Sequence, residues 1–276
     1  MKKLTKVALA LLLTFGLVGC GEKEKTTEGT KTLTVSATLD PHSRLLEEAK
    51  PILKEKYDID LEIKVLDDYY IFNKTLNTGE VDANFFQHRP FFEGELAEFD
   101  YDLVEAGAIH LEPFGFYSQT IKDVSELKNG SKIVISNSVA DHGRILAILE
   151  ENGLITLKEG TDPLNSTLKN IEENPLNLEF VEIKPEMLTT TYKSDKSVDL
   201  VAINGNYAIQ AGLNPVKDAV ILEEASEDNP YVNIVACQKG HENDESIKAL
   251  VEVLKSDEMK DFIKKTYADG SVIPVQ

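Results

Sequence analysis

The sequence predicts an α/β protein built from two lobes that share a cleft. Segments with strand and helix patterns alternate from Thr32 onward, and the alternation restarts after Pro113. About 245 residues follow the polar N-terminal stretch, which is enough chain for two separate cores. Because strands and helices alternate, we expect largely parallel sheets with helices on both faces.

The first lobe is predicted to begin with a strand, a helix and two further strands. Residues Thr32–Thr38 alternate polar and apolar side chains, the pattern of a strand. Asp40 and Pro41 follow as an N-cap and a proline at the first helical position. The next apolar residues have helical spacing: Leu45, Leu46, Ala49, Ile52 and Leu53. Leu61–Leu66 and Val81–Phe86 are the next two predicted strands.

The second lobe is predicted to occupy residues 113–228, between two parts of the first lobe at 32–112 and 229–276. Its strands are expected at Lys132–Ser136, Leu178–Ile183 and Asp199–Ile203, and a helix at Asp141–Asn152. After residue 228 the chain has a strand pattern at Val232–Ala236, then helix patterns at Ile247–Leu254 and Met259–Tyr267. These last elements are predicted to return to the first lobe.

Residues 1–19 have the pattern of a bacterial signal peptide. Three lysines precede an apolar run at Val7–Val18, and Gly19 and Cys20 follow it. The run is about a dozen residues long, too short for the roughly 20 residues that span a bilayer. The end of the run resembles a lipobox, which implies cleavage before Cys20 and acyl chains on that cysteine. The alternative is an ordinary secretory signal in which the cysteine is incidental.

Residues 20–31 are predicted to form the lipidated cysteine and a flexible tether, because they contain no side chain suited to a core. Without residues 1–19 the chain keeps 26 basic and 48 acidic side chains, a balance that repels nucleic acid. With Cys20 lipidated, Cys237 has no partner for a disulfide. Its apolar surroundings predict a buried, inert thiol.

The sequence lacks the motifs of common enzyme classes, and no catalytic residues or cofactor are predicted. It contains no phosphate-binding glycine loop, no serine-hydrolase elbow and no zinc-protease motif. The five histidines are never within five residues of one another, so local metal-ligand spacing is absent. A metal receptor built from distant segments stays open as an alternative, with His42, His88, His110 or His142 beside a carboxylate.

Arg144 is the first candidate ligand-binding residue. The strand Lys132–Ser136 leads into the predicted helix at Asp141, which would place Arg144 in the first helical turn, at the sheet edge where ligands bind. A cation there is electrostatically unfavourable, and this suggests a functional role in holding a carboxylate. The alternative is a solvated arginine paired with Asp141 or Glu150.

Two further segments reach the same edge. Asp82–His88 delivers Phe86 and His88 on one face of a strand, although Phe85 and Phe86 could simply fill the core. Val201–Tyr207 is a strand that leads into asparagine and glycine, whose amides could bind a polar ligand or cap a helix.

Five segments in order resemble the NlpA/MetQ family of methionine-binding lipoproteins, the substrate-binding subunits of a methionine ABC importer. They are DANFFQHRPF from Asp82, HLEPFGFYS from His110, GRIL from Gly143, AINGNYA from Ala202 and PYVNI from Pro230. The resemblance implies a type II-like periplasmic-binding fold that closes on methionine, a related amino acid or a methionine peptide. It also implies a monomer, lipid-anchored on the extracytoplasmic face of the cell membrane, that serves an ABC permease with a separate ATPase.

The resemblance also implies roles for individual residues. Arg144 should bind the ligand carboxylate, while Asn204 and Asn233 hydrogen-bond the carboxylate and the ammonium. Three further residues should form the wall of the side-chain pocket: Tyr69, Phe86 and His88.

The chain departs from the family pattern at two places near this cleft. Residues 137–142 read NSVADH, without the usual proline and with a new histidine, and Phe72 replaces a common proline.

Overall fold

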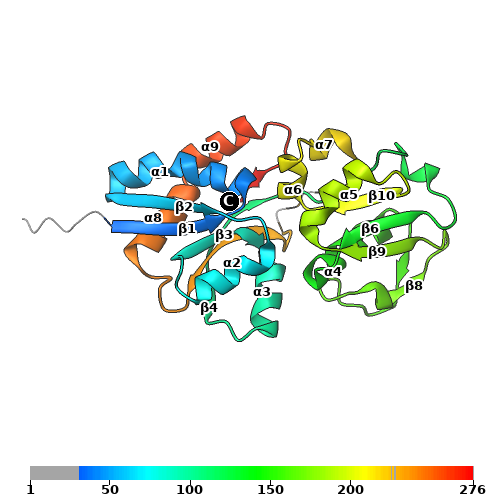
Figure 1. Cartoon of the computed structure of the whole chain (residues 1–276), viewed down its shortest axis with the longest axis horizontal. Coiled ribbons are helices and arrows are strands. Elements are labelled where there is room, and N and C mark those ends of the chain that lie inside the picture. The colour runs from blue at the N-terminus through cyan, green and yellow to red at the C-terminus, as the bar shows by residue number, and fades with distance from the viewer. Residues whose placement is uncertain (1–30, 225, 227, 276) are drawn as a thin grey trace, which may run out of the picture.

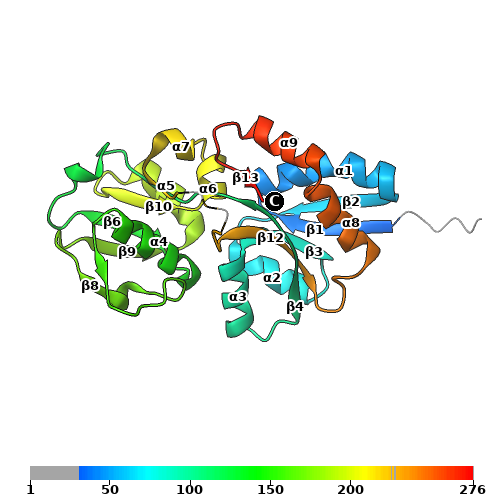
Figure 2. The ribbon, with the colours of Figure 1, turned by 180° about the vertical axis from the view of Figure 1, so that it is seen from behind.

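The computed structural model describes residues 31–224, 226 and 228–275. Figure 1 shows two α/β halves side by side, each organised around its own sheet. The predicted signal peptide and Cys20 lie outside the described residues, as does the predicted tether up to residue 30. The first strand begins at Lys31, one residue earlier than expected. In both ribbon views this strand starts at the end of the first half that lies farthest from the second half (Figures 1 and 2).

The first half contains a six-stranded sheet in the order β13-β4-β12-β3-β1-β2. Its strands are β1 (Lys31–Ala37), β2 (Ile59–Val65), β3 (Ala83–His88), β4 (Leu103–Leu111), β12 (Val232–Gln238) and β13 (Ile273–Pro274). Strand β1 pairs in parallel with β2 and β3, whereas β12 pairs antiparallel with β3 and β4. The chain therefore leaves this sheet after β4 and returns to its middle through β12.

The second half contains a five-stranded sheet in the order β11-β5-β10-β6-β9. Its strands are β5 (Gly115–Tyr117), β6 (Lys132–Ser136), β9 (Glu179–Ile183), β10 (Leu200–Ile203) and β11 (Ala219–Leu222). Strands β6, β9 and β10 are parallel, but β5 is antiparallel to both of its neighbours. A separate small ribbon pairs β7 (Thr156–Leu157) with β8 (Ile171–Glu173).

Helices cover both sheets. They are α1 (Arg44–Tyr57), α2 (Tyr69–Asn77), α3 (Arg89–Glu98), α4 (Val139–Glu151), α5 (Leu188–Ser194), α6 (Gly205–Gln210), α7 (Pro215–Asp218), α8 (Glu245–Leu254) and α9 (Asp257–Thr266). Short helical turns lie at η1 (Leu39–Ser43), η2 (Val124–Glu126), η3 (Leu168–Asn170) and η4 (Pro185–Met187). No helix among the residues that the structure describes is long and apolar enough to cross a membrane.

The expectation of largely parallel sheets is wrong, because both sheets are mixed. Strands β4 and β12, which pair antiparallel, lie next to the two passages between the halves. Along the chain, β5 is the first strand of the second sheet and β11 is the last. The strands that carry the chain into each sheet after a passage, β5 and β12, run opposite to the strands of the β-α-β units beside them. Local alternation of strand and helix patterns cannot detect that reversal.

The predicted helix after Asp40 and the predicted burial of Cys237 agree with the structure. Asp40 has extended backbone and precedes the helical residues, and the five apolar residues predicted to lie on this helix are all buried in α1. Cys237 is fully buried in the core formed by α1, α8 and the first sheet. Burial raises the pKa of its thiol to about 11, which suits an unreactive side chain.

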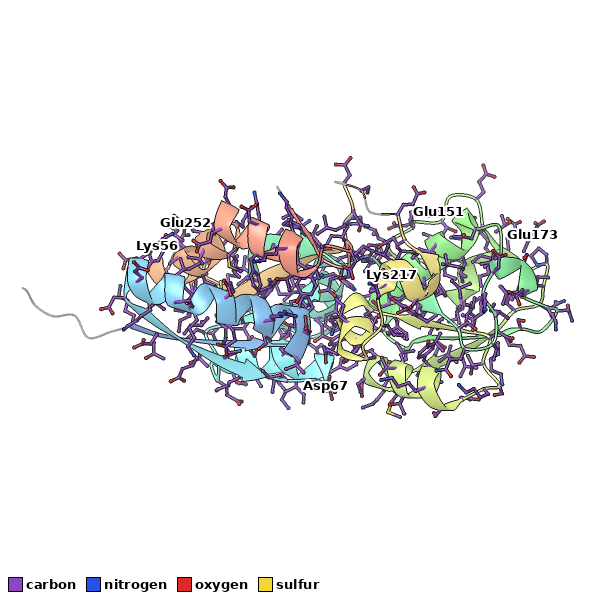
Figure 3. All side chains as sticks on the ribbon, turned by 90° about the horizontal axis from the view of Figure 1, so that it is seen from above. Lys56, Asp67, Glu151, Glu173, Lys217 and Glu252 are labelled. Atoms are coloured by element: carbon purple, nitrogen blue, oxygen red, sulfur yellow. The ribbon has the colours of Figure 1, made fainter. Side chains whose placement is uncertain are left out.

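Two connectors join the halves. The first runs through Glu112–Phe114 between β4 and β5, and the second runs from Glu223 to Tyr231 between β11 and β12, with residues 225 and 227 undescribed. Helix α6 lies at the junction in both ribbon views (Figures 1 and 2). Charged side chains lie on the surface of both halves, as Lys56 and Glu252 at one end and Glu173 at the other illustrate (Figure 3).

Candidate functional site

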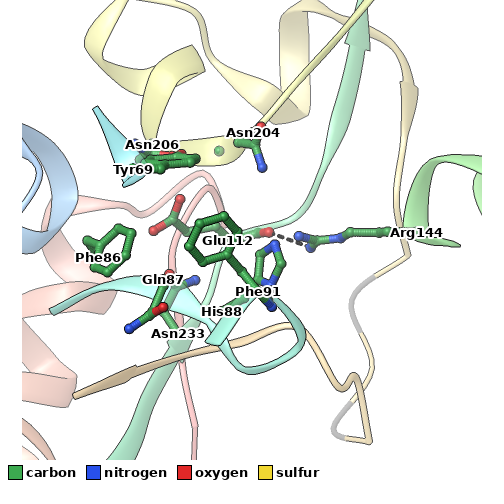
Figure 4. Close-up of a pocket in the computed structure, with 11 residues that line it drawn as sticks. Tyr69, Phe86, Gln87, His88, Phe91, Glu112, Arg144, Asn204, Asn206 and Asn233 are labelled. Atoms are coloured by element: carbon green, nitrogen blue, oxygen red, sulfur yellow. Dashed lines mark hydrogen bonds between the residues drawn. The ribbon is translucent and has the colours of Figure 1, made fainter. Parts of the chain in front are cut away.

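A pocket of about 350 Å³, its opening to solvent included, lies where the two halves meet. All six residues predicted to bind the ligand line this pocket. The complete lining is Tyr69, Phe86, Gln87, His88, Phe91, Glu112, Arg144, Asn204, Gly205, Asn206 and Asn233. Figure 4 shows these side chains arranged around Glu112 and Phe91, with Arg144 entering from the side opposite Phe86.

The pocket is built from the ends of secondary-structure elements. Tyr69 begins α2, and His88 ends β3, where it lies opposite Asn233 of β12 in the antiparallel register. The second half contributes Arg144 from α4 and Asn204 from the end of β10. The side chains that line the pocket therefore come from both halves.

Arg144 does not lie in the first turn of its helix, so that expectation is wrong. Helix α4 begins at Val139 after the N-cap Ser138, two residues earlier than predicted, and Arg144 is its sixth residue. The first turn instead contains Asp141, the charge that a helix N-terminus favours. The electrostatic argument that singled out Arg144 therefore fails, although the residue does reach the pocket.

The partner of Arg144 is neither Asp141 nor Glu150 but Glu223. Its Nε and Nη2 donate to the two carboxylate oxygens of Glu223 at 2.8 and 2.5 Å, and Nη2 also donates to the backbone carbonyl of Glu112 at 2.8 Å. The guanidinium is 4% exposed and lies over the rings of Tyr231 and Phe114. Its Nη1 group makes no hydrogen bond with a described residue and remains available as a donor.

Three asparagines present fixed amide atoms to the pocket. Asn204 occupies the N-cap position of α6 but makes no capping bond; its Nδ2 donates to Asp141 at 3.2 Å and its Oδ1 has no partner in the described part of the chain. Asn206 accepts a 2.5 Å bond from the Tyr69 hydroxyl, and its Nδ2 has no described partner. The Oδ1 of Asn233 lies 3.1 Å from Nε2 of His42. The pocket therefore offers an acceptor at Asn204 and donors at Asn206 and Asn233.

His88 connects the two halves. Its Nδ1 accepts a hydrogen bond from the Phe91 backbone N–H at 3.1 Å, so its proton lies on Nε2, which donates to Asp141 at 3.1 Å. Asp141 is 1% exposed. Burial alone would raise the pKa of Asp141, but the hydrogen bonds from His88 and Asn204 hold it below its ordinary value.

Aromatic rings form the apolar wall. Tyr69, Phe86 and Phe91 have ring centroids 5.8 to 5.9 Å apart. Phe72, one of the departures from the family pattern, stacks on Phe86 at 3.9 Å and supports this wall from behind. Such a surface suits an apolar or thioether side chain.

Glu112 is a pocket residue that the sequence prediction missed. It is 4% exposed, and its Oε1 lies 2.8 Å from Nε2 of His110 and 3.5 Å from Nε2 of His42. Burial lowers the pKa of His42 to about 4 and that of His110 to about 3, so both rings are neutral near pH 7. Burial raises the pKa of Glu112.

The four histidines of the metal-receptor alternative do not meet. His42 and His110 lie together beside Glu112, within 4.8 Å for one ligand atom from each residue. However, Nδ1 and Nε2 of His42 are already hydrogen-bonded to Thr38 and Asn233. His88 bonds Asp141, and His142 lies beside the Ser136 carbonyl and Glu182. The cluster is better described as a hydrogen-bond network around Glu112.

Comparison with known proteins identifies the family. The family model of the NlpA lipoproteins matches residues 33–276. The chain belongs to the NlpA lipoprotein family. It is 50% identical over 276 residues to the methionine-binding lipoprotein MetQ of Bacillus subtilis, covering 100% of this chain and 99% of that protein.

Solved structures of this family share the fold. A lipoprotein from Bacillus subtilis is 51% identical, with a TM-score of 0.86, and the match covers 89% of this chain and 98% of that one. A nutrient-binding protein from Burkholderia cenocepacia, solved with methionine bound, is 33% identical with a TM-score of 0.82, covering 88% of this chain and 99% of that one. The two-lobe periplasmic-binding fold expected from the sequence is thereby confirmed.

The residues that the sequence prediction missed all lie within the family segments. Gln87 and Phe91 belong to DANFFQHRPF, Glu112 to HLEPFGFYS, and Gly205 and Asn206 to AINGNYA. A Cβ atom on Gly205 would lie 2.6 Å from Cβ of Glu112, so only glycine fits there. The sequence marks these segments, but it does not show which side chain in each segment points inward.

Proposed function

We propose that this chain is an extracytoplasmic substrate-binding protein that captures methionine, or a closely related amino acid or methionine peptide, for an ABC importer. A match to a methionine-binding lipoprotein runs the length of the chain, and a match to the periplasmic substrate-binding protein of an ABC transporter covers 88% of it. The pocket also has the chemistry of an amino-acid site. Methionine-binding proteins of this family are the relatives that share its sequence and fold.

The observation that carries the proposal is the set of polar atoms that face the pocket without a hydrogen-bond partner among the described residues. Donors remain at Nη1 of Arg144 and Nδ2 of Asn206, and an acceptor remains at Oδ1 of Asn204. Buried polar atoms of this kind are costly unless a ligand satisfies them. A zwitterion offers both an acceptor group and a donor group, and the adjoining aromatic wall suits a thioether.

In this proposal Arg144 binds the ligand carboxylate, and Asn204 and Asn233 hydrogen-bond the carboxylate and the ammonium. Tyr69, Phe86 and His88 enclose the side chain. Because Glu223 already occupies the Nε edge of Arg144, the carboxylate would approach Nη1.

The same proposal assigns a lipid on Cys20, after removal of residues 1–19, and a tether over residues 20–31. Anchored on the outer face of the cell membrane, a monomer would deliver its ligand to a permease driven by a separate ATPase. The proposed lobes are residues 32–112 with 229–276, and residues 113–228.

Calorimetry tests the proposal. Protein is unfolded and refolded to remove bound ligand, then titrated with a panel of amino acids and dipeptides. We expect methionine or a methionine peptide to bind with a Kd well below roughly 100 μM, about −5.5 kcal/mol. If no member of the panel reaches that affinity, the receptor function is wrong.

A further inference from the structure

One wall of the pocket is formed by three consecutive residues of β3: Phe86, Gln87 and His88 (Figure 4). In a regular strand neighbouring side chains point to opposite faces, so three in a row could not all reach one pocket. The register with β12 explains the exception, because it passes from Gln87 directly to Phe85 and leaves Phe86 as an extra residue on its strand. Phe86 is therefore the extra residue of a β-bulge, a feature that changes the direction of side chains.

A buried amide network lies on both sides of this bulge. Asn84 precedes it, Gln87 follows it, and Asn73 reaches both from α2; their side chains belong to residues that are 0%, 3% and 0% exposed. Oδ1 of Asn73 accepts hydrogen bonds from Nδ2 of Asn84 at 2.9 Å and from Nε2 of Gln87 at 2.8 Å. Nδ2 of Asn73 donates to Oε1 of Gln87 at 2.8 Å. The network therefore holds the bulge at both ends and ties it to α2.

The amide group of Gln87 is engaged in this network although its side chain lines the pocket. Its Oε1 accepts from Asn73, and its Nε2 donates to Asn73 and, at 3.0 Å, to Oδ1 of Asn84. An amide nitrogen has two hydrogens, so both donors of Gln87 are used inside the protein. Gln87 therefore fixes the shape of the pocket and has no donor left for a ligand.

Helix α2 connects the network to the aromatic wall. Tyr69 and Asn73 are four residues apart on this helix and so share one face, and Phe72 lies directly before Asn73. The ring of Phe72 stacks on Phe86 with centroids 3.9 Å apart, and the ring of Tyr69 lies 5.8 Å from Phe86. Because Asn73 fixes α2 on β3, it also fixes the spacing of these rings.

The chemistry of the network indicates a demand for exact geometry. Burying amide groups costs free energy unless every one of them is hydrogen-bonded, and an apolar cluster could fill the same space. Apolar contacts allow a helix to shift slightly on a sheet, whereas hydrogen bonds tolerate only a narrow range of distance and angle. Three mutually bonded amides therefore hold α2 more exactly than apolar packing would.

We propose that Asn73, Asn84 and Gln87 are positioning residues that set the spacing of the aromatic wall, and that this spacing selects ligands by the length of their side chain. This inference rests on the proposed function and extends it, because it names the residues that decide which amino-acid side chains fit. When the network is broken, α2 can shift relative to Phe86, and side chains of other lengths are accepted almost as well.

The test compares methionine with its homologues one methylene shorter and one methylene longer, S-methylcysteine and ethionine. Each is titrated by calorimetry into the refolded wild type and into Asn73→Ala; if the ligand is a methionine peptide, the same three residues are compared within that peptide. We expect the wild type to prefer methionine over each homologue by about tenfold or more, the usual effect of one methylene in a closely fitting pocket. Asn73→Ala should reduce each preference to about threefold or less.

Leu76→Ala is the matched control. Leu76 is also fully buried on α2, but it packs in a different cluster with Val81 and Leu103. Its truncation loosens α2 without removing an amide, so it should lower stability and leave the preference unchanged. Asn73→Asp keeps an acceptor oxygen for the other two amides and should retain more of the preference than Asn73→Ala.

The possible outcomes separate this inference from the proposed function. If the wild type binds neither methionine nor any other amino acid or dipeptide, the proposed function fails, and the inference fails with it. If the wild type binds methionine no better than the homologues, or if Asn73→Ala keeps the full preference, the inference alone is wrong. It is equally wrong if Leu76→Ala reduces the preference as much as Asn73→Ala does. If Asn73→Ala does not fold, Asn84→Ala replaces it: a reduced preference supports the inference, and an unchanged preference overturns it.

Discussion

Glu112 and Glu223 are two carboxylates in equivalent places with opposite electrostatic environments. Each begins one of the two connectors between the halves, and each contacts Arg144. Glu223 binds the guanidinium through its side chain, whereas Glu112 does so only through its backbone carbonyl. Burial acts to raise the pKa of both, but Arg144 lowers the pKa of Glu223 below its ordinary value while that of Glu112 stays raised.

The difference shows how one arginine can stabilise the fold and still have a hydrogen-bond donor available for a ligand. With Glu223 the arginine forms a permanent neutral pair that ties α4 to the second connector. With Glu112 the arginine bonds only the backbone carbonyl, and the pKa of the carboxyl stays raised by burial although Arg144 acts to lower it. The two carboxylates should therefore respond in opposite ways to the same substitutions.

The largest expected effect comes from Arg144→Ala, which would leave Glu223 buried without a cation. We expect the free energy of unfolding to fall by about 3 to 5 kcal/mol, and methionine binding to be lost. Urea denaturation and calorimetry on the refolded variant measure the two effects. A variant as stable as the wild type would show that Glu223 is solvated in solution.

Neutralising each carboxylate separately should give effects of opposite sign. Glu223→Gln leaves Arg144 without its counter-ion and should lower the free energy of unfolding by about 2 to 3 kcal/mol. In ligand-free protein Glu112→Gln replaces a carboxyl whose pKa burial raises, and it should leave the free energy of unfolding unchanged or raise it by up to about 1 kcal/mol. Equal losses in urea denaturation would remove the distinction between the two sites.

The pH dependence of stability should distinguish the same two sites. His42 and His110 have folded-state pKa values of about 4 and 3, lower than the ordinary 6.5. The unfolded chain therefore binds more protons between pH 6.5 and 4, and stability present above pH 6.5 is lost as the pH falls through this range. From pH 7 to 5 we expect each histidine to remove on the order of 1 to 2 kcal/mol.

Glu112 opposes this loss, because a raised folded-state pKa makes the folded protein bind a proton more readily as the pH falls. Glu223 contributes little in this window, since its pKa lies below 4.5. Denaturation at pH 7 and pH 5 should therefore show a steeper loss in Glu112→Gln than in the wild type. A shallower loss would contradict the assigned direction of the Glu112 shift.

The smallest effect on stability is expected at a second arginine–glutamate pair, which has the same two hydrogen bonds but is less buried. Arg89 donates through Nε and Nη2 to Glu105 at 2.7 and 2.8 Å, with side chains 38% and 27% exposed. Arg89→Ala should lower the free energy of unfolding by no more than about 1 kcal/mol and leave ligand binding intact. A loss as large as that of Arg144→Ala would mean that burial does not explain the difference between these pairs.

Sequence reasoning located the segments of the site better than the contacts within it. Strand Lys132–Ser136 begins and ends as predicted, and all six candidate pocket residues line the pocket. Side-chain periodicity and family segments are local features of the chain. They therefore indicate which segments form elements and reach the site, but not which side chains contact one another. Glu223 lies in a stretch without periodic pattern, so nothing in the sequence indicated that it would be the partner of Arg144.

Two of the errors have a common physical origin in long-range contacts. The antiparallel strands β4 and β12 meet across more than a hundred residues of chain, which no local pattern records. The N-terminal start of α4 at Val139 was missed because residues 137–142 lack the proline that usually marks the first helical position. Glu112 was overlooked because its importance depends on His42 and His110, which the fold brings together from separate segments.

Arg144 contacts both connectors: Phe114 and the Glu112 carbonyl in the first, and Glu223 and Tyr231 in the second. Any relative movement of the halves must bend these connectors, so it changes the surroundings of this guanidinium. Affinity for a carboxylate and the opening of the cleft are then linked quantities, and the linkage is reciprocal. A membrane partner that pulls the halves apart would weaken the hold on the ligand by as much free energy as the ligand contributes to keeping them together.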